Sequence, residues 1–193
     1  VNANSGTVTF GNTVGAGGLT VNSSALSAIN YSIASTGNID LNISGAVSVA
    51  SGVRLTAGGD GTSLAIDAAG ITLGAGTSGS ETVANSGTGT ITLTSTGSNN
   101  ITLEDYTVGA GTGLITMTSA GEIRGNNDTT ADIQSSGNVT LSANGIGNGS
   151  YALAIGGTSS DDTLTITDTG ANNVYIYEIA DRFNQVTITQ QNA

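Results

Sequence analysis

The chain alternates apolar and polar residues in short runs. Each run follows Gly or Asn, places Thr or Ser between aliphatic residues, and closes on small polar residues, as in residues 89–93, 100–103 and 137–141. Period-two alternation bounded by Gly, Asn or Ser is typical of β-strands. No window combines an apolar stripe of helical spacing with helix caps. The pattern therefore predicts a protein that is almost entirely β.

The spacing of the runs indicates which β architecture they form. Prominent runs begin at Ile71, Ile91, Ile115 and Val139, which are 20 to 24 residues apart. A repeat of this length indicates a solenoid, because a propeller blade needs about 40 residues with aromatic signatures. An immunoglobulin-like sandwich normally contains a core Trp, and this chain has none. We predict one right-handed parallel β-helix, or β-solenoid, over residues 1–193, with coils of about 20 residues.

The composition suits such a solenoid. Val, Ile and Leu fill the interior, Thr faces water, and the 30 Gly residues, with Asn, turn the corners where positive φ is needed. The chain has no Pro, which would remove a hydrogen bond from the ladder between coils.

Three stretches, residues 89–103, 111–123 and 137–143, resemble the repeat region of filamentous-haemagglutinin-type exoproteins. These are large adhesins of Gram-negative bacteria that are exported by two-partner secretion. The resemblance extends over about residues 37–189 and does not include the family's secretion domain. It implies a secreted or surface-attached right-handed β-helix that acts as an adhesin stalk or display segment and contacts a host or cell-surface receptor.

The residues that are missing exclude whole classes of chemistry. The chain has no His or Cys, its three basic residues are Arg54, Arg124 and Arg182, and its net charge is −11. Catalytic triads, structural zinc sites and Schiff-base chemistry are therefore absent. Nucleic-acid binding needs a basic surface that the chain lacks, and no apolar stretch is long enough to insert into a membrane as a helix. We predict neither an enzyme nor a bound cofactor.

A carbohydrate-binding or carbohydrate-processing β-helix is the alternative from another functional class. Such enzymes place paired carboxylates on one face. Neighbouring residues of a strand point to opposite faces, so adjacent acids form no pair unless they lie at a corner. The candidate acids are Asp60, Asp67, Glu104, Asp105, Asp161 and Asp162.

Two segments partly match the calcium-binding nonapeptide of RTX proteins, at residues 58–64 and 156–164. Shared calcium sites require tandem nonapeptides. Neither segment repeats in tandem, and this favours solvated corners over calcium binding.

Thr-x-Thr pairs recur along the chain, for example at Thr92/Thr94, Thr116/Thr118 and Thr165/Thr167. Aligned pairs of this kind resemble the surface of β-solenoid antifreeze proteins, which makes ice binding a further alternative. The irregular spacing predicts coils of unequal length, in which the pairs do not line up. Thr is also simply a favourable outward strand residue.

Residues 172–193 differ from the rest because they concentrate aromatic residues. They predict an aromatic end coil whose candidate contact surface consists of Tyr175, Tyr177, Arg182 and Phe183. The simpler interpretation is that Tyr175 and Tyr177 are outward residues of a strand covering the last coil. No helical cap is recognisable, so an open end that stacks on a neighbouring repeat or on another copy of the chain, as in an extracellular filament, is the related hypothesis.

Overall fold

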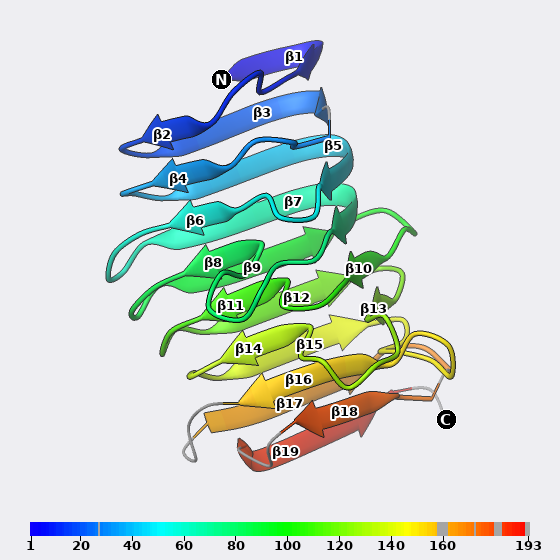
Figure 1. The fold of residues 1–193 in the computed structure, drawn as a ribbon. Coiled ribbons are helices and arrows are strands. Elements are labelled where there is room, and N and C mark those ends of the chain that lie inside the picture. The colour runs from blue at the N-terminus through cyan, green and yellow to red at the C-terminus, as the bar shows by residue number, and fades with distance from the viewer. Residues whose placement is uncertain (27, 158–161, 172, 180–182, 192–193) are drawn as a thin grey trace.

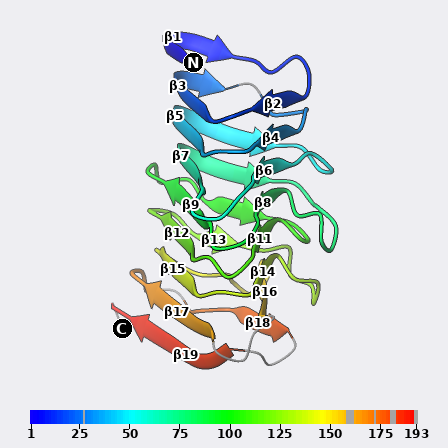
Figure 2. The same ribbon diagram turned by 90° about the vertical axis from the view of Figure 1, so that its left-hand side faces the viewer.

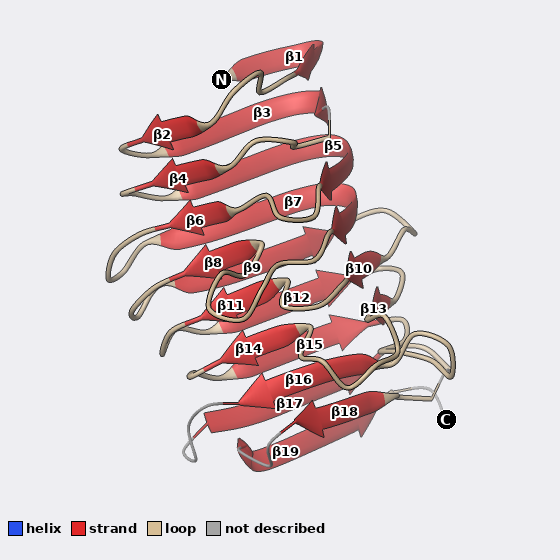
Figure 3. Ribbon diagram, viewed as in Figure 1, coloured by secondary structure: helices blue, strands red, loops and turns tan. Residues whose placement is uncertain are grey.

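The structure is a computed structural model that describes residues 1–26, 28–157, 162–171, 173–179 and 183–191 of the 193-residue chain. Throughout these residues the regular structure is β-strand (Figure 3). No helix in the described ranges is long and apolar enough to cross a membrane.

The strands wind into a right-handed parallel solenoid, as the sequence predicts. In Figure 1 the chain runs leftward along a front strand such as β4 (Ile33–Ser35), turns, and returns rightward along a rear strand such as β5 (Ile39–Val49) one level lower. The two sets of strands lie on opposite sides of the stack (Figure 2).

Two sheets build the solenoid, and every pairing within them is parallel. Sheet A follows the path β1 (Asn2–Val8), β3 (Leu19–Leu26), β5, β7 (Ser63–Leu73), β9 (Thr90–Ser95), β12 (Ile115–Ser119), β15 (Val139–Ala143), β17 (Asp162–Asp168) and β19 (Phe183–Gln190). Sheet B follows the path β2 (Val14–Ala16), β4, β6 (Leu55–Ala57), β8 (Val83–Asn85), β11 (Val108–Ala110), β14 (Ile133–Ser135), β16 (Leu153–Gly157) and β18 (Ile176–Ile179).

The core consists of columns of aliphatic side chains that follow the stack. One column of sheet A contains Ile39, Leu64, Ile91, Ile115, Val139, Leu164 and Val186, and the next contains Leu41, Ile66, Leu93, Met117, Leu141, Ile166 and Ile188. Apart from Val186 and Ile188 on β19, every member is at most 1% exposed. Each coil thus buries its apolar residues against the coils on both sides.

A third, shorter side closes the cross-section. β5 and β7 are 11 residues long, and after a bend their second halves pair with one another. This row continues through β10 (Ile101–Leu103) and β13 (Ile123–Arg124). Ile71 pairs with Ile101 on this side, so placing Ile71 in one repeat series with Ile91 was wrong. The residue that aligns with Ile91 is Leu64.

Coil length varies without disturbing the strand register. Paired residues are 20 positions apart between Leu19 and Ile39, and 27 apart between Leu64 and Ile91. Most of the extra residues lie between the strands, and the paired residues keep one register apart from local shifts such as the one between Ile43 and Ala46. The prediction that unequal coils keep the Thr-x-Thr pairs from lining up is therefore wrong: Thr165 pairs with Thr140, 25 positions before it, and with Thr187, 22 positions after it.

Glycine at one corner permits the closest approach between coils. Gly89, Gly113 and Gly137 occupy equivalent positions just before β9, β12 and β15. A Cβ at Gly113 would overlap the carbonyl group of Gly89, and a Cβ at Gly137 would lie 2.5 Å from the carbonyl oxygen of Gly113. A side chain at this corner would force neighbouring coils apart.

The register predicts that whole coils can be removed. Ile91 pairs with Ile115, 24 positions further on. Deleting residues 93–116 joins Thr92 to Met117, which takes the place of Leu93 and keeps every apolar residue inward. We expect a folded protein, with the circular dichroism of β structure and cooperative thermal unfolding, that is one strand spacing, about 4.8 Å, shorter by X-ray scattering.

Deleting residues 93–115 is the matched control, because it removes one residue fewer and joins Thr92 to Thr116. A shift of one residue reverses the two faces of a strand, so this variant should lose cooperative unfolding. Equal stability of the two deletions would contradict the columnar core.

Candidate functional site

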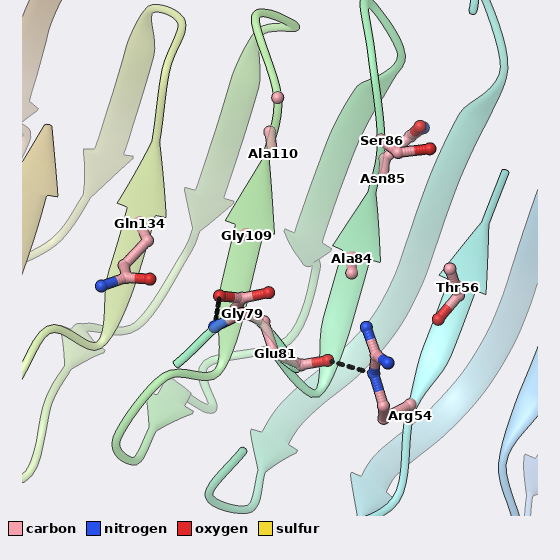
Figure 4. Close-up of a pocket in the computed structure, with 11 residues that line it drawn as sticks. Arg54, Thr56, Gly79, Glu81, Ala84, Asn85, Ser86, Gly109, Ala110 and Gln134 are labelled. Carbon is pink, nitrogen blue, oxygen red and sulfur yellow. Dashed lines mark hydrogen bonds between the residues drawn. The ribbon is translucent and has the colours of Figure 1, made fainter. Parts of the chain in front are cut away.

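A shallow groove lies on the outer surface of sheet B and crosses β6, β8, β11 and β14 (Figure 4). Its volume is about 270 Å³. The floor contains Ala84, Gly109 and Ala110, and because two of these carry only a methyl group and Gly109 has no side chain, they leave room above the sheet. Polar side chains of Arg54, Thr56, Asn85 and Gln134 surround it.

Glu81 and Arg54 supply the charges of this groove. The Arg54 Nε donates a hydrogen bond to the Glu81 carbonyl oxygen at 3.3 Å, and the Glu81 carboxylate accepts one from the Gly79 amide at 2.9 Å. Glu81 also lies against Gly109, where a Cβ would be 2.6 Å from Glu81 Cγ. The groove offers hydrogen-bond donors and acceptors to a polar ligand, but no aromatic residue lines it.

The candidate acids that lie in described residues do not meet in a catalytic pair. Asp60 accepts a hydrogen bond from the Thr88 amide of the next coil, and Asp67 is exposed on sheet A. Glu104 and Asp105 lie at a turn and engage different coils: Glu104 accepts a bond from the Ala75 amide, whereas Asp105 accepts one from the Asn126 side chain. Asp162 is buried, and Asp161 lies outside the described residues.

Asp132, which the sequence did not indicate, is a buried acid with a raised pKa. It directly precedes β14 and is fully buried. Its Oδ2 accepts a hydrogen bond from the Ala154 amide at 2.8 Å, while its Oδ1 has no partner in the described structure. Burial raises the pKa of Asp132 to about 8, and the charges of Asp128 and Asp105 add to the rise. The sequence offers no signal for this burial, because Asp132 resembles any polar residue before a strand.

No group of His, Cys, Asp or Glu that could hold a metal ion occurs in the described residues. The first calcium-like segment, residues 58–64, forms a corner in which Asp60 is tied to Thr88. In the second, residues 156–164, positions 158–161 lie outside the described part.

The basic residues are engaged by their own neighbours where the structure describes them. Arg124 forms an ion pair with Glu122 and lies over the ring of Tyr151, 5.2 Å from its centroid. Arg54 binds the Glu81 carbonyl group.

The structure separates the residues of the C-terminal candidate contact surface. Tyr175 and Tyr177 are exposed, whereas Val174 and Ile176 between and beside them are half-buried against the core. Phe183 is buried in the core and is not part of the exposed surface. Arg182 lies outside the described residues.

The core columns of sheet A are open at β19. Val186 is 42% exposed and Ile188 is 53% exposed, although their column neighbours Leu164 and Ile166 are at most 1% exposed. A cavity of about 260 Å³ lies between these residues and β18. On the sheet B side, Glu178 pairs with Ile155 and so occupies the position of a core aliphatic residue. The end of the stack is therefore apolar on one side and acidic on the other.

Comparisons of the chain with family models, with curated proteins and with solved structures find no match. The resemblance to filamentous-haemagglutinin-type exoproteins stays a prediction from the repeat pattern.

Asp132 predicts a distinct pH dependence of stability. A carboxyl group whose pKa is raised on folding stabilises the folded state while it is protonated in both states, below about pH 4. That contribution is lost as the pH rises towards 8, with a slope of at most about 1.4 kcal/mol per pH unit. Asp132→Asn keeps an acceptor for the Ala154 amide and removes the titration. We expect the variant to be more stable than the wild type at pH 8–9 and similar to it near pH 4.

Thermal unfolding followed by circular dichroism from pH 4 to pH 9 measures this difference. Asp67→Asn, at an exposed acid, is the control and should follow the wild-type profile. If Asp132→Asn also follows the wild-type profile, the raised pKa is disproved.

Proposed function

We propose that the chain is a non-catalytic extracellular segment that acts as the stalk or display part of a bacterial surface adhesin. The observation that carries the proposal is the continuity of the core columns from coil to coil. A core built this way can be extended only along the axis, so each added coil makes the molecule longer. A stalk needs length and stiffness, and it needs no reactive group.

The dispersal of charged side chains supports the same function. The described candidate acids contact separate coils, and Arg54 and Arg124 are held by neighbouring groups. A catalytic site needs such groups to converge on one reacting atom. The resemblance of residues 89–103 to adhesin repeats supplies the extracellular setting, and a receptor on a host or cell surface is the partner that it implies.

Glu178, on the last described coil, opposes end-to-end association of copies of this chain, as a filament subunit would need. Val186 and Ile188 present an apolar surface on which a further coil can pack. Glu178 occupies a core position beside them, and its carboxylate accepts a hydrogen bond from the Phe183 amide at 3.2 Å. Burying that carboxylate under another copy of the chain would cost free energy, because a buried charge needs a partner. Inward-facing charges at a sheet edge are a known means of preventing edge-to-edge association.

End variants test this proposal by sedimentation velocity and electron microscopy. We expect the wild type to stay short and Glu178→Leu to form longer rods through end-to-end contact. Adding Ile188→Lys to Glu178→Leu should abolish the rods, whereas adding Leu114→Lys, at an exposed apolar residue on the side of the stack, should not. Long rods of the wild type would support the filament subunit instead and would overturn the stalk.

Carbohydrate binding is the second candidate, and the polar groove around Arg54 favours it. A glycan array tests it: binding that Arg54→Ala removes would establish the groove as a carbohydrate site, and the absence of any bound glycan would eliminate this candidate.

A further inference from the structure

Sheet A carries two straight rows of hydroxyl-bearing residues on its outer surface. They lie on the five successive strands β9, β12, β15, β17 and β19, and the register between these strands is unbroken at these positions. We call these residues the threonine array. It consists of Thr92, Thr116, Thr140, Thr165 and Thr187 in one row, and Thr94, Thr118, Ser142, Thr167 and Thr189 in the other.

The backbone sets the spacing of the array. Neighbours within a row are one strand spacing apart, about 4.8 Å, and the two rows are two residues apart along the strand, about 6.7 Å. Nine of the ten residues are Thr and carry one hydroxyl and one methyl group each, and Ser142 carries a hydroxyl group alone. Both repeats are close to those of oxygen atoms on exposed planes of hexagonal ice.

The hydroxyl groups of the array are free to bind water. In the described structure, no side-chain hydrogen bond holds any of these ten residues to another part of the protein. The N-terminal part of the same face differs, because the Asn42 side chain donates to Asn22 at 3.0 Å and that of Asn22 donates to Asn2 at 2.8 Å. The Asn side chains are hydrogen-bonded to one another, whereas the hydroxyl groups of the array are left to the solvent.

The array is also uncharged, although the chain has a net charge of −11. The outward residues flanking it on the same strands are neutral as well: Thr90, Leu114, Asn138, Thr163 and Gln185. Outward acids on this face, Asp40 and Asp67, belong to β5 and β7, outside the array. A charged side chain holds a hydration shell of its own and would interrupt an ordered water layer, so its exclusion from ten adjacent positions suits a surface that binds ordered water.

The array is rigid before it meets a ligand. Ile91, Ile115 and Val139 beneath it are fully buried, and Thr has few χ1 rotamers because it is β-branched. Binding therefore costs little conformational entropy. Each contact with a lattice water is weak, but contacts at ten fixed positions act together.

We propose that the threonine array binds the surface of ice. The ligand is the ordered water lattice. The hydroxyl groups form hydrogen bonds with its water molecules, and the methyl groups fit into the spaces between these molecules.

Partition into a slowly growing ice hemisphere tests the proposal, together with microscopy of ice crystals in the protein solution. Thr140→Lys places a long charged side chain at the centre of the array. Thr20→Lys is the matched control, because Thr20 is an exposed outward residue of the same sheet on β3, outside the array. We expect the wild type and Thr20→Lys to enter the ice and shape the crystals, and Thr140→Lys to be depleted from the ice by about tenfold or more.

Circular dichroism must show that both variants are folded, and a second array variant, Thr116→Lys, replaces Thr140→Lys if that protein does not fold. Exclusion of the wild type from ice overturns the proposal. Equal partition of the wild type and the array variant does so too, because the ice would then bind elsewhere. Retention of the wild type on crystalline cellulose or chitin, without entry into ice, would assign the array to a polysaccharide surface instead. None of these outcomes affects the stalk proposal, which the end variants test separately.

Discussion

The parallel hydrogen-bond ladder between successive coils is the constraint on which the rest of this molecule depends. Each strand forms backbone hydrogen bonds with the same two neighbouring strands along its length. A side chain can therefore face inward only if the side chains paired with it in the adjoining coils also face inward. Ile115, held between Ile91 and Val139, is an example. The ladder turns a short alternating sequence into continuous columns, and the hydrophobic effect then stabilises all coils together.

The same ladder divides the molecule into parts with different freedom. Inward positions must be aliphatic, and the corners must leave room for the next backbone, as Gly113 does against Gly89. Outward positions need be neither aliphatic nor small, so their side chains can be of types that contact other molecules. The turns are free in length, which is why coils of 20 and 27 residues stack in one register. Two acids are exceptions: Asp132 is a fully buried carboxyl group inside the stack, and Glu178 at its end pairs with the core residue Ile155.

Alternation was enough to predict the strands and their inward-facing residues, and the spacing of the runs was enough to predict the parallel solenoid, because all three follow from a repeated local pattern and from the need to bury its apolar residues. Which strands are neighbours could not be predicted the same way. Ile71 and Leu64 both begin good alternating runs, and only the bend within β7 decides that Leu64 aligns with Ile91. The alignment of Thr165 with Thr140 and Thr187 was not predicted either, because turns of unequal length hide the common register of these strands in the sequence. The burial of Asp132 arises from contacts with a coil 22 residues away and leaves no local trace.

Distances between spin labels along one outward row test the stacked register most directly. The row runs Thr20, Asp40, Ala65, Thr92, Thr116, Thr140, Thr165 and Thr187, and the chain has no cysteine to interfere with labelling. Double electron–electron resonance between two spin labels should give distances that rise by about 4.8 Å per strand, from about 19 Å to about 34 Å. The first label is placed at Thr20→Cys, and the second at Thr116→Cys, Thr140→Cys, Thr165→Cys or Thr187→Cys. Distances that do not increase in equal steps along this order would contradict the parallel in-register stack.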